Sequence, residues 1–179
     1  MATPRPGVKP QHLGPGPKDT GPSYITRAGY QRLRDEHHRL VTVDRPRATD
    51  AVTEAAAHGD RSENAEYIYG KKKLRELDRR IRFLEQRLGK AKIVDTLTQD
   101  RSRVCFGATV TLEDGDDGEE KVWILVGEDE TDVKRRRISW KSPVGNALMG
   151  RRVGDTISVV TPGGRREFDL VGVDYQPID

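Results

Sequence analysis

The stretch AAAHGDRSENAEY, residues 55–67, carries two carboxylates that can bind a metal ion. Asp60 and Glu63 are three residues apart, so on a helical turn their side chains lie close together. Carboxylate oxygens are the ligands that hard divalent cations such as Mg²⁺ prefer. Two carboxylates leave most of a magnesium shell to water, so a useful site needs further ligands from a partner. We therefore expect a shared magnesium site, with no ion held by this chain alone.

The same two residues also fit a structural role. Asp60 followed by Glu63 has the spacing of a capping box, in which Asp60 caps the next helix and Glu63 bonds back to it. Spacing alone leaves both roles open. A self-contained hydrolase site that adds His58 is disfavoured, because a hairpin tip offers no pocket to exclude water.

A strongly basic segment follows this stretch. Residues 71–92 contain ten lysines or arginines against three acidic residues, a net charge of +7. Such a density favours contact with nucleic acid phosphates, although a solvated helix face is the plain alternative. Two tyrosines, Tyr67 and Tyr69, precede the segment and can stack on a base.

Helical periodicity on both sides of the stretch predicts the element that positions it. Leucine, isoleucine and alanine recur at alternating spacings of three and four between Leu74 and Ala91, which is a heptad seam. Thr26 is the expected N-cap of an earlier helix. Pro46 interrupts the apolar pattern of that helix, so we expect a kink or stutter there. An antiparallel coiled-coil hairpin over 24–98 explains these features better than a single helix lying on a globular core.

The hairpin separates two unlike segments. Residues 1–23 are rich in proline and glycine without apolar periodicity, which predicts a flexible tail. After residue 103 the apolar period changes to two, with EDGDDGEE as turn material between two strands and VGNALMG as a short helix. Residues 104–179 are therefore expected to form a small domain of helix and strands, and the whole chain an α+β protein.

Composition excludes several classes of protein. The chain has one cysteine, Cys105, which rules out a disulfide framework and a cysteine-based zinc site. We find no phosphate-binding loop, no dinucleotide fingerprint and no nucleophile elbow. No secretory signal and no membrane-spanning run is apparent. We expect a cytoplasmic protein that does not associate with membranes.

Three longer segments carry a family resemblance. GDRSENAEYIYGKKKLRELDRRIRFLEQRLGKAKIVD, together with ITRAGYQRL and SPVGNALMGRRVGD, resembles the Gre transcript cleavage factors of bacterial RNA polymerase, and among them the GreB type. The resemblance covers residues 24 to about 175 and leaves the first 23 residues outside. It implies a monomeric accessory factor whose coiled coil, with an acidic tip at 59–66, enters the polymerase secondary channel. It also implies an FKBP-like C-terminal domain that docks near the channel entrance.

The resemblance also implies roles for individual residues. Asp60 and Glu63 match the family's tip acids, which help to hold the second Mg²⁺ at the polymerase active centre, where backtracked RNA is cut. The polymerase would therefore be the enzyme, and this chain an activator of its cleavage reaction. Ser142 and Pro143 match a loop near the polymerase-docking surface. The nascent RNA 3′ segment would run along a basic stripe made of Lys71, Lys72, Lys73, Arg75 and Arg79.

Two other functions remain open at this point. A protein of the same fold can occupy the channel and inhibit the polymerase without cleavage, although retention of Asp60 and Glu63 disfavours this reading. Alternatively, the coiled coil can be an RNA-binding module that acts independently of any polymerase.

Overall fold

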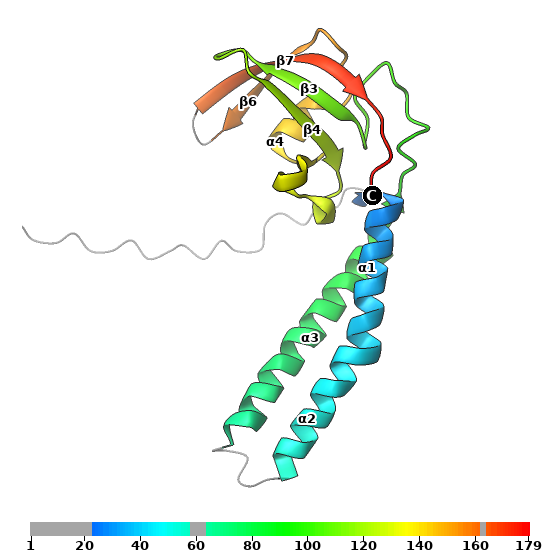
Figure 1. The fold of residues 1–179 in the computed structure, drawn as a ribbon, viewed down its shortest axis with the longest axis vertical. Helices are drawn as coiled ribbons and strands as arrows, with labels where there is room; N and C mark the ends of the chain where they lie inside the picture. Colours follow the sequence, from blue (N-terminus) through cyan, green and yellow to red (C-terminus); the bar gives the residue numbers. More distant parts are fainter. Residues whose placement is uncertain (1–22, 58–63, 162–163) are drawn as a thin grey trace, which may run out of the picture.

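The structure, a computed structural model, consists of a long helical hairpin attached to a small sheet domain (Figure 1). It describes residues 23–57, 64–161 and 164–179. The predicted tail, apart from its last residue, therefore lies outside the described residues, and so do Asp60 and Glu63. Within the described part of the chain, no helix is long and apolar enough to cross a membrane.

Two antiparallel helical arms form the hairpin (Figure 1). The first arm comprises α1 (Arg27–Arg39), a π-helical turn η1 (Leu40–Asp44) and α2 (Arg45–Ala57), and the second is α3 (Ala65–Lys90). At the base, β1 (Ser23–Ile25) pairs in parallel with β2 (Ala91–Ile93). The predicted coiled-coil hairpin and the α+β fold class are confirmed.

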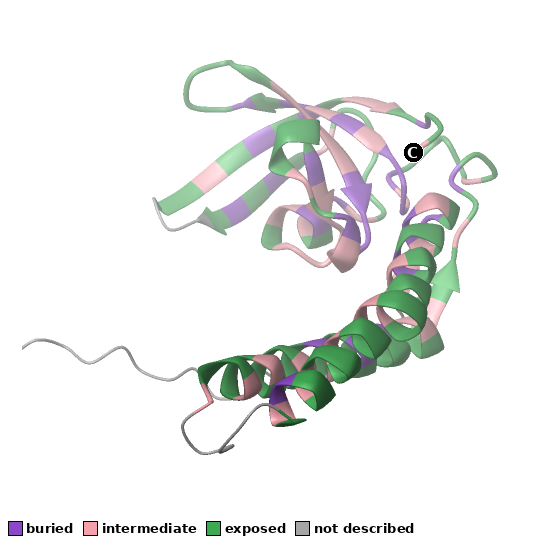
Figure 2. Cartoon of the chain, turned by 60° about the horizontal axis from the view of Figure 1, so that its bottom comes forward, coloured by how far each residue is buried: buried purple, intermediate pink, exposed green. Residues whose placement is uncertain are grey.

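The predicted seam holds the two arms together. Leu77, Ile81 and Leu84 are buried on α3, and Leu33 and Ala55 are buried on the first arm. Thr26 caps α1 as expected, because its hydroxyl oxygen accepts a hydrogen bond of 2.9 Å from the Gly29 N–H. Figure 2 shows that buried residues are sparse along the hairpin and concentrated in the sheet domain.

The expected irregularity near Pro46 is the π-helical turn η1, which ends at Asp44, two residues before Pro46. Proline has no N–H to donate to the preceding turn, and its ring crowds the carbonyl four residues earlier. A π-helical turn inserts one extra residue and widens the helix locally. The apolar positions after Pro46, at Ala48, Val52 and Ala55, are one step out of phase with those before it. The extra residue of the π-helical turn explains this shift, and the helix continues to Ala57.

The sheet domain is a five-stranded sheet with the strand order β5-β4-β3-β7-β6. Its strands are β3 (Thr109–Asp114), β4 (Glu120–Val126), β5 (Arg137–Ser139), β6 (Thr156–Thr161) and β7 (Gly164–Asp174). Neighbouring strands are antiparallel except for β4 and β5. The short helix α4 (Pro143–Leu148) contributes Leu148 to a core that includes Val110, Leu125 and Leu170.

The predicted β3–β4 hairpin forms, with its turn where EDGDDGEE placed it. The alternation that marked the strand, however, did not identify the face of β4 that packs on the core. The alternation in the sequence is that of Val122, Ile124 and Val126. Trp123 and Leu125 pack on the core, whereas Val122 and Ile124 lie opposite Thr111 and Thr109 on the other face. Both faces of this strand carry apolar residues, so an apolar period of two indicates a strand but does not show which of its faces packs on the core.

A three-residue turn joins the hairpin to the sheet domain. This 3₁₀ turn η2 is Glu128–Glu130, and Glu130 is only 5% exposed. The Glu130 carboxylate accepts hydrogen bonds from the backbone N–H groups of Thr26 at 3.0 Å and Gly127 at 3.2 Å, and from the Thr26 hydroxyl. A carboxylate is thus bound at the N-terminus of α1, where the helix macrodipole favours negative charge.

The second arm is tied to the same turn. Arg87 of α3 forms ion pairs with Glu128 at 3.0 Å and with Asp129 at 3.3 Å. Burial raises the pKa of Asp129, and the nearby Arg87 opposes this increase. Aromatic packing of Tyr24 against Phe106 and Trp140 completes the junction. The orientation of the hairpin on the sheet domain is therefore fixed through both arms.

Gly29 tests the importance of the buried carboxylate. A Cβ atom at Gly29 would lie 2.1 Å from Glu130 Oε1, so Gly29→Ala must displace a carboxylate that several donors hold. We expect a loss of about 2 kcal/mol in the free energy of unfolding, measured by urea denaturation followed by circular dichroism. Gly89→Ala is the matched control, since no atom lies within 4 Å of its Cβ position, and it should gain about 0.5 kcal/mol. Equal effects at both glycines would contradict this account of the junction.

Candidate functional site

The distal end of the hairpin is organised by Asn64. Its Oδ1 accepts a hydrogen bond of 3.1 Å from the Tyr67 N–H, so Asn64 is the N-cap of α3. Its Nδ2 donates to the Ala55 carbonyl oxygen at 2.7 Å, which satisfies a carbonyl near the end of α2. One side chain therefore caps the second arm and links it to the first, directly beside the segment 58–63.

The capping interpretation of Asp60 is wrong, because α3 begins at Ala65 and its cap is Asn64. We missed Asn64 in the sequence because Asp60 and Glu63 match the spacing of a capping box. The available signal was asparagine itself, a preferred N-cap residue, placed immediately before the helix. Asp60 and Glu63 lie outside the described residues, so their metal-ligand role stays a prediction.

Acidic residues near this end also include Glu66, which is exposed in the first turn of α3. Its charge is favourable there because it faces the positive end of the helix dipole. Among the described residues, no group of three or more His, Cys, Asp or Glu side chains is arranged to hold a metal ion. Oxygen ligands such as those of Asp60 and Glu63 suit magnesium chemically, but as a pair they complete only part of its coordination shell.

Ion pairs between the arms stiffen the hairpin below this end. Arg80 binds Glu36 with two hydrogen bonds, at 2.7 and 2.8 Å, and Arg45 binds Asp78 at 2.8 Å. The hydrogen bond from Arg80 lowers the pKa of Glu36. Pairs this exposed contribute little stability individually, but the bidentate geometry of the Arg80–Glu36 pair restricts the rotation of one arm against the other.

The predicted basic stripe divides into separate groups. Lys72, Arg75 and Arg79 lie together with Arg82 around a hollow of about 430 Å³ on α3. Lys71 instead lies over the Tyr67 ring, 5.2 Å from its centroid, and Lys73 faces the groove between α2 and α3. We call the first group the basic face, and define it as Lys72, Arg75, Arg79 and Arg82. The predicted RNA-contact set omitted Arg82.

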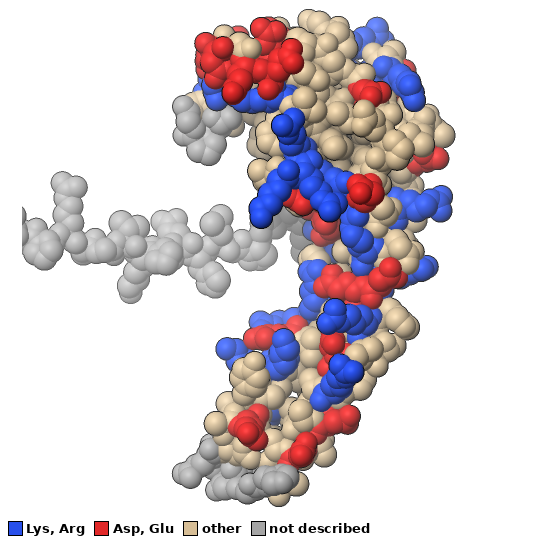
Figure 3. Space-filling model, viewed as in Figure 1, with Lys and Arg blue, Asp and Glu red and all other residues tan. Residues whose placement is uncertain are grey.

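The basic face differs from other cations of the same helix in lacking acidic partners. Within the described parts of the chain, none of its four members forms a salt bridge, whereas Arg80 and Arg87 pair with acidic side chains. Figure 3 shows the two charges interspersed along the hairpin, and acidic side chains gathered over the β3–β4 turn of the sheet domain. Positive charge without an acidic neighbour is available to phosphate groups.

The two predicted docking residues lie at the start of α4. The Ser142 hydroxyl oxygen accepts a hydrogen bond of 3.1 Å from the Gly145 N–H, so Ser142 is the N-cap of this helix. Pro143 occupies the first turn and is exposed. Beside them is a mainly apolar groove of about 580 Å³, and we call it the sheet groove. Its lining includes Trp123, Val133, Ile138, Ser142, Val144 and Phe168.

The described part of the chain thus combines a helical hairpin, a basic face and a separate sheet domain. Two family models match the chain: "Transcription elongation factor, N-terminal" over residues 23–93 and "Transcription elongation factor, GreA/GreB, C-term" over residues 99–175. The chain belongs to the GreA/GreB family of transcription elongation factors. The family predicted from the three sequence segments is thereby confirmed.

Named relatives agree with this assignment. Transcription elongation factor GreB of Pseudomonas aeruginosa is 50% identical over 161 residues, which cover 90% of this chain and 95% of that protein. GreB of Yersinia pestis is 50% identical over 157 residues, covering 88% and 91% respectively. GreA of Anaeromyxobacter is 42% identical over 151 residues, covering 84% and 91%. Among solved structures, GreA factor homolog 1 of Thermus thermophilus matches with a TM-score of 0.41 and 31% identity, over 86% of this chain and 99% of that one.

Two substitutions separate the functions of Asn64. Asn64→Ala removes the cap and the link between the arms, so we expect a loss of about 1–2 kcal/mol in stability and faster hydrogen exchange at the Tyr67 amide. Asn64→Asp keeps an oxygen that can cap α3 but loses the donor to the Ala55 carbonyl. Asn64→Asp should therefore preserve the protection of the Tyr67 amide from hydrogen exchange, whereas exchange should become faster at the end of α2. Unchanged exchange at Tyr67 in Asn64→Ala would contradict the assigned cap.

Proposed function

We propose that this chain binds bacterial RNA polymerase, inserts its hairpin into the secondary channel and stimulates endonucleolytic cleavage of backtracked nascent RNA at the polymerase active centre. Cleavage would give an arrested complex a new RNA 3′ end. The observation that carries the proposal is the rod: at its end remote from the sheet domain, α2 ends at Ala57 and α3 begins at Ala65 (Figure 1). The residues between these two helices in the sequence include Asp60 and Glu63. Family membership supports the same reading, since the relatives are named transcription elongation factors.

The dimensions of the rod suit delivery into a deep cavity. Helix α3 has 26 residues, which at 1.5 Å per residue gives roughly 39 Å of reach from the sheet domain. The junction at Glu130 and Arg87 fixes the base of the rod. A rigid rod places its end at a defined depth, which a flexible linker of the same length cannot do.

Asp60 and Glu63 are the proposed working groups at the end of the rod. A second Mg²⁺ in a two-metal phosphodiester hydrolysis helps to activate water or to stabilise the leaving oxygen. The two carboxylates would offer oxygen ligands and negative charge to that ion, completing a site that the polymerase supplies in part. In this proposal the chain has no catalysis of its own, and the active centre belongs to the polymerase.

The basic face is proposed to bind the extruded RNA 3′ segment. Its four side chains project from three successive turns of α3, a spacing that follows a nucleic acid backbone rather than a single phosphate. Because these side chains have no acidic partners among the described residues, RNA does not have to displace an existing ion pair. Contact of this kind weakens as ionic strength rises.

The sheet groove is proposed to dock on the polymerase near the channel entrance, with Pro143 and Ser142 at its edge. Apolar lining residues such as Trp123 and Val133, surrounded by polar and cationic groups, have the composition of a protein interface. Ser142 also caps α4, so a change there would affect folding as well as docking. Pro143 is exposed and is the better residue for isolating a docking contribution.

Conservative substitutions of the two acids test the proposed cleavage function. Asp60→Asn and Glu63→Gln remove charge while nearly preserving shape, and neither removes the cap of α3, which is Asn64. In halted, backtracked complexes with labelled RNA, each should slow cleavage about a hundredfold or more, partly restored by added magnesium. Polymerase affinity and thermal stability should not change.

Asp50→Asn and Glu76→Gln are the matched controls, because they make the same charge changes at exposed positions of the hairpin. They should cleave at the parental rate. If Asp60→Asn and Glu63→Gln also cleave at the parental rate under limiting magnesium, metal delivery is refuted. Inhibition without RNA shortening by the parent chain would instead identify a channel-blocking regulator, and RNA binding that ignores the polymerase would identify an RNA-binding module.

A pair of exposed valines tests the docking surface. Val133 is 77% exposed and lines the sheet groove, whereas Val160 is 74% exposed on β6, at the opposite edge of the sheet. Val133→Ser should weaken polymerase binding about tenfold, since it removes one apolar side chain from the interface. Val160→Ser should leave affinity unchanged. Equal affinities for both variants, measured by fluorescence anisotropy, would exclude the groove as the docking surface.

A further inference from the structure

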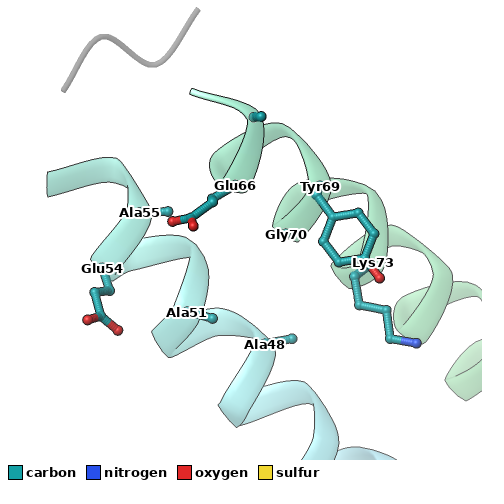
Figure 4. Close-up of a pocket in the computed structure, with 9 residues that line it drawn as sticks. Ala48, Ala51, Glu54, Ala55, Glu66, Tyr69, Gly70 and Lys73 are labelled. Atoms are coloured by element: carbon teal, nitrogen blue, oxygen red, sulfur yellow. The ribbon is translucent and has the colours of Figure 1, made fainter. Parts of the chain in front are cut away.

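A second groove lies between α2 and α3 beside the distal end of the hairpin, and we call it the arm groove (Figure 4). Its volume is about 690 Å³, which is in the range of pockets that bind small ligands. Alanines of α2, namely Ala48, Ala51 and Ala55, form one side. At Gly70, on the other side, a Cβ atom would lie 2.7 Å from the Val52 side chain. Close approach of the arms at Gly70 combined with small alanine side chains leaves this space unfilled.

Tyr69 gives the arm groove an aromatic wall. It is 70% exposed and, among the described residues, has no ring contact and no hydrogen bond through its hydroxyl. Tyr67, by contrast, is half-buried and lies beneath Lys71. An exposed aromatic ring at the edge of a groove is a platform on which a planar ring can stack.

Opposite charges flank this ring on the same helix. Lys73 lies one turn after Tyr69 and projects on the same side of α3, and Glu66 lies one turn before it and points toward α2 (Figure 4). Lys73 forms no salt bridge within the described residues, so its ammonium group is available to a phosphate. A carboxylate at Glu66 accepts hydrogen bonds from amino groups. The combination of a flat apolar wall, a cation and an acceptor complements a nucleotide.

We propose that the arm groove binds one nucleotide of single-stranded RNA, with its base stacked on Tyr69, its phosphate at Lys73 and its amino group at Glu66. This inference rests on the proposed function, because cleavage requires extruded RNA to pass this end of the hairpin. The exposed Tyr69 ring beside the Lys73 ammonium favours RNA over a protein segment as the occupant, and Glu54, the other carboxylate of the lining, points away from α3 (Figure 4). Since Glu66 accepts hydrogen bonds, adenine, cytosine and guanine should bind better than uracil, which has no exocyclic amino group.

Fluorescence of 2-aminopurine tests the groove directly. The base is placed in the extruded RNA of a backtracked polymerase complex, and the chain is added with Asp60→Asn and Glu63→Gln so that the RNA stays intact. Stacking on a tyrosine should quench the emission. Tyr69→Ala should abolish the quenching, and Tyr69→Phe should retain it because the ring is preserved. In a chain with intact acids, Tyr69→Ala should slow cleavage about tenfold.

Two further variants make the test specific to the groove. Ala51→Leu fills the arm groove with a good helix former and should also abolish the quenching while Tyr69 remains. Ile68→Ala is the matched control, since Ile68 is 55% exposed on the same turn but does not line the groove. It should quench like the parent.

The outcomes separate this inference from the proposed function. Suppose that the Asp60 and Glu63 variants lose cleavage but that Tyr69→Ala or Ala51→Leu quenches like the parent. Nucleotide binding in the arm groove would then be refuted, and the proposed metal delivery would stand. Nucleotide binding in the groove would also be refuted if Tyr69→Ala bound the polymerase more weakly but left the 2-aminopurine emission the same as with Tyr69 present. That result would show that a protein segment occupies the groove. Cleavage at the parental rate in the acid variants would refute the proposed function, whatever the fluorescence shows.

Discussion

The hairpin's position depends on a single buried carboxylate, that of Glu130. Its oxygens accept hydrogen bonds from the Thr26 backbone and hydroxyl and from Gly127, and Arg32 lies 3.7 Å away as the nearest cation. A buried charge is tolerated only when such partners compensate for lost hydration. Because Thr26 is the N-cap of α1 whereas Gly127 precedes η2, the requirement to satisfy Glu130 also sets where the rod begins and in which direction it points.

A rod transmits that orientation only if its shape is fixed, and this hairpin has a curved shape (Figure 2). The π-helical turn at Leu40–Asp44 absorbs the disturbance from Pro46, so that the first arm continues without a break. Bidentate pairing of Arg80 with Glu36 and the seam at Ile81 and Leu84 hold the two arms in one register. At the far end, Asn64 again links the arms. The rod is therefore constrained at its base, middle and end, by contacts of different chemistry.

Local patterns predicted the elements well, and contacts between distant residues account for what they missed. The heptad seam, the Thr26 cap and the β3–β4 turn all follow from residues close in sequence. Glu130 could not be recognised as a junction residue, because Thr26 is 104 positions away. Asn64 was overlooked because Asp60 and Glu63 matched a capping box. The roles of those two acids come from family resemblance, since they lie outside the described residues.

The cations of α3 have different roles in the folded protein, which the composition of the helix does not reveal. A net charge of +7 over residues 71–92 treats every lysine and arginine alike. In the folded hairpin, Arg80 and Arg87 are neutralised by acidic partners and hold the rod in place, whereas the basic face remains open. Salt screens exposed charges over about 8–10 Å and affects partly buried pairs much less. We therefore expect ionic strength to weaken the proposed contact with RNA, while the junction, which is buried around Glu130, keeps the orientation of the rod.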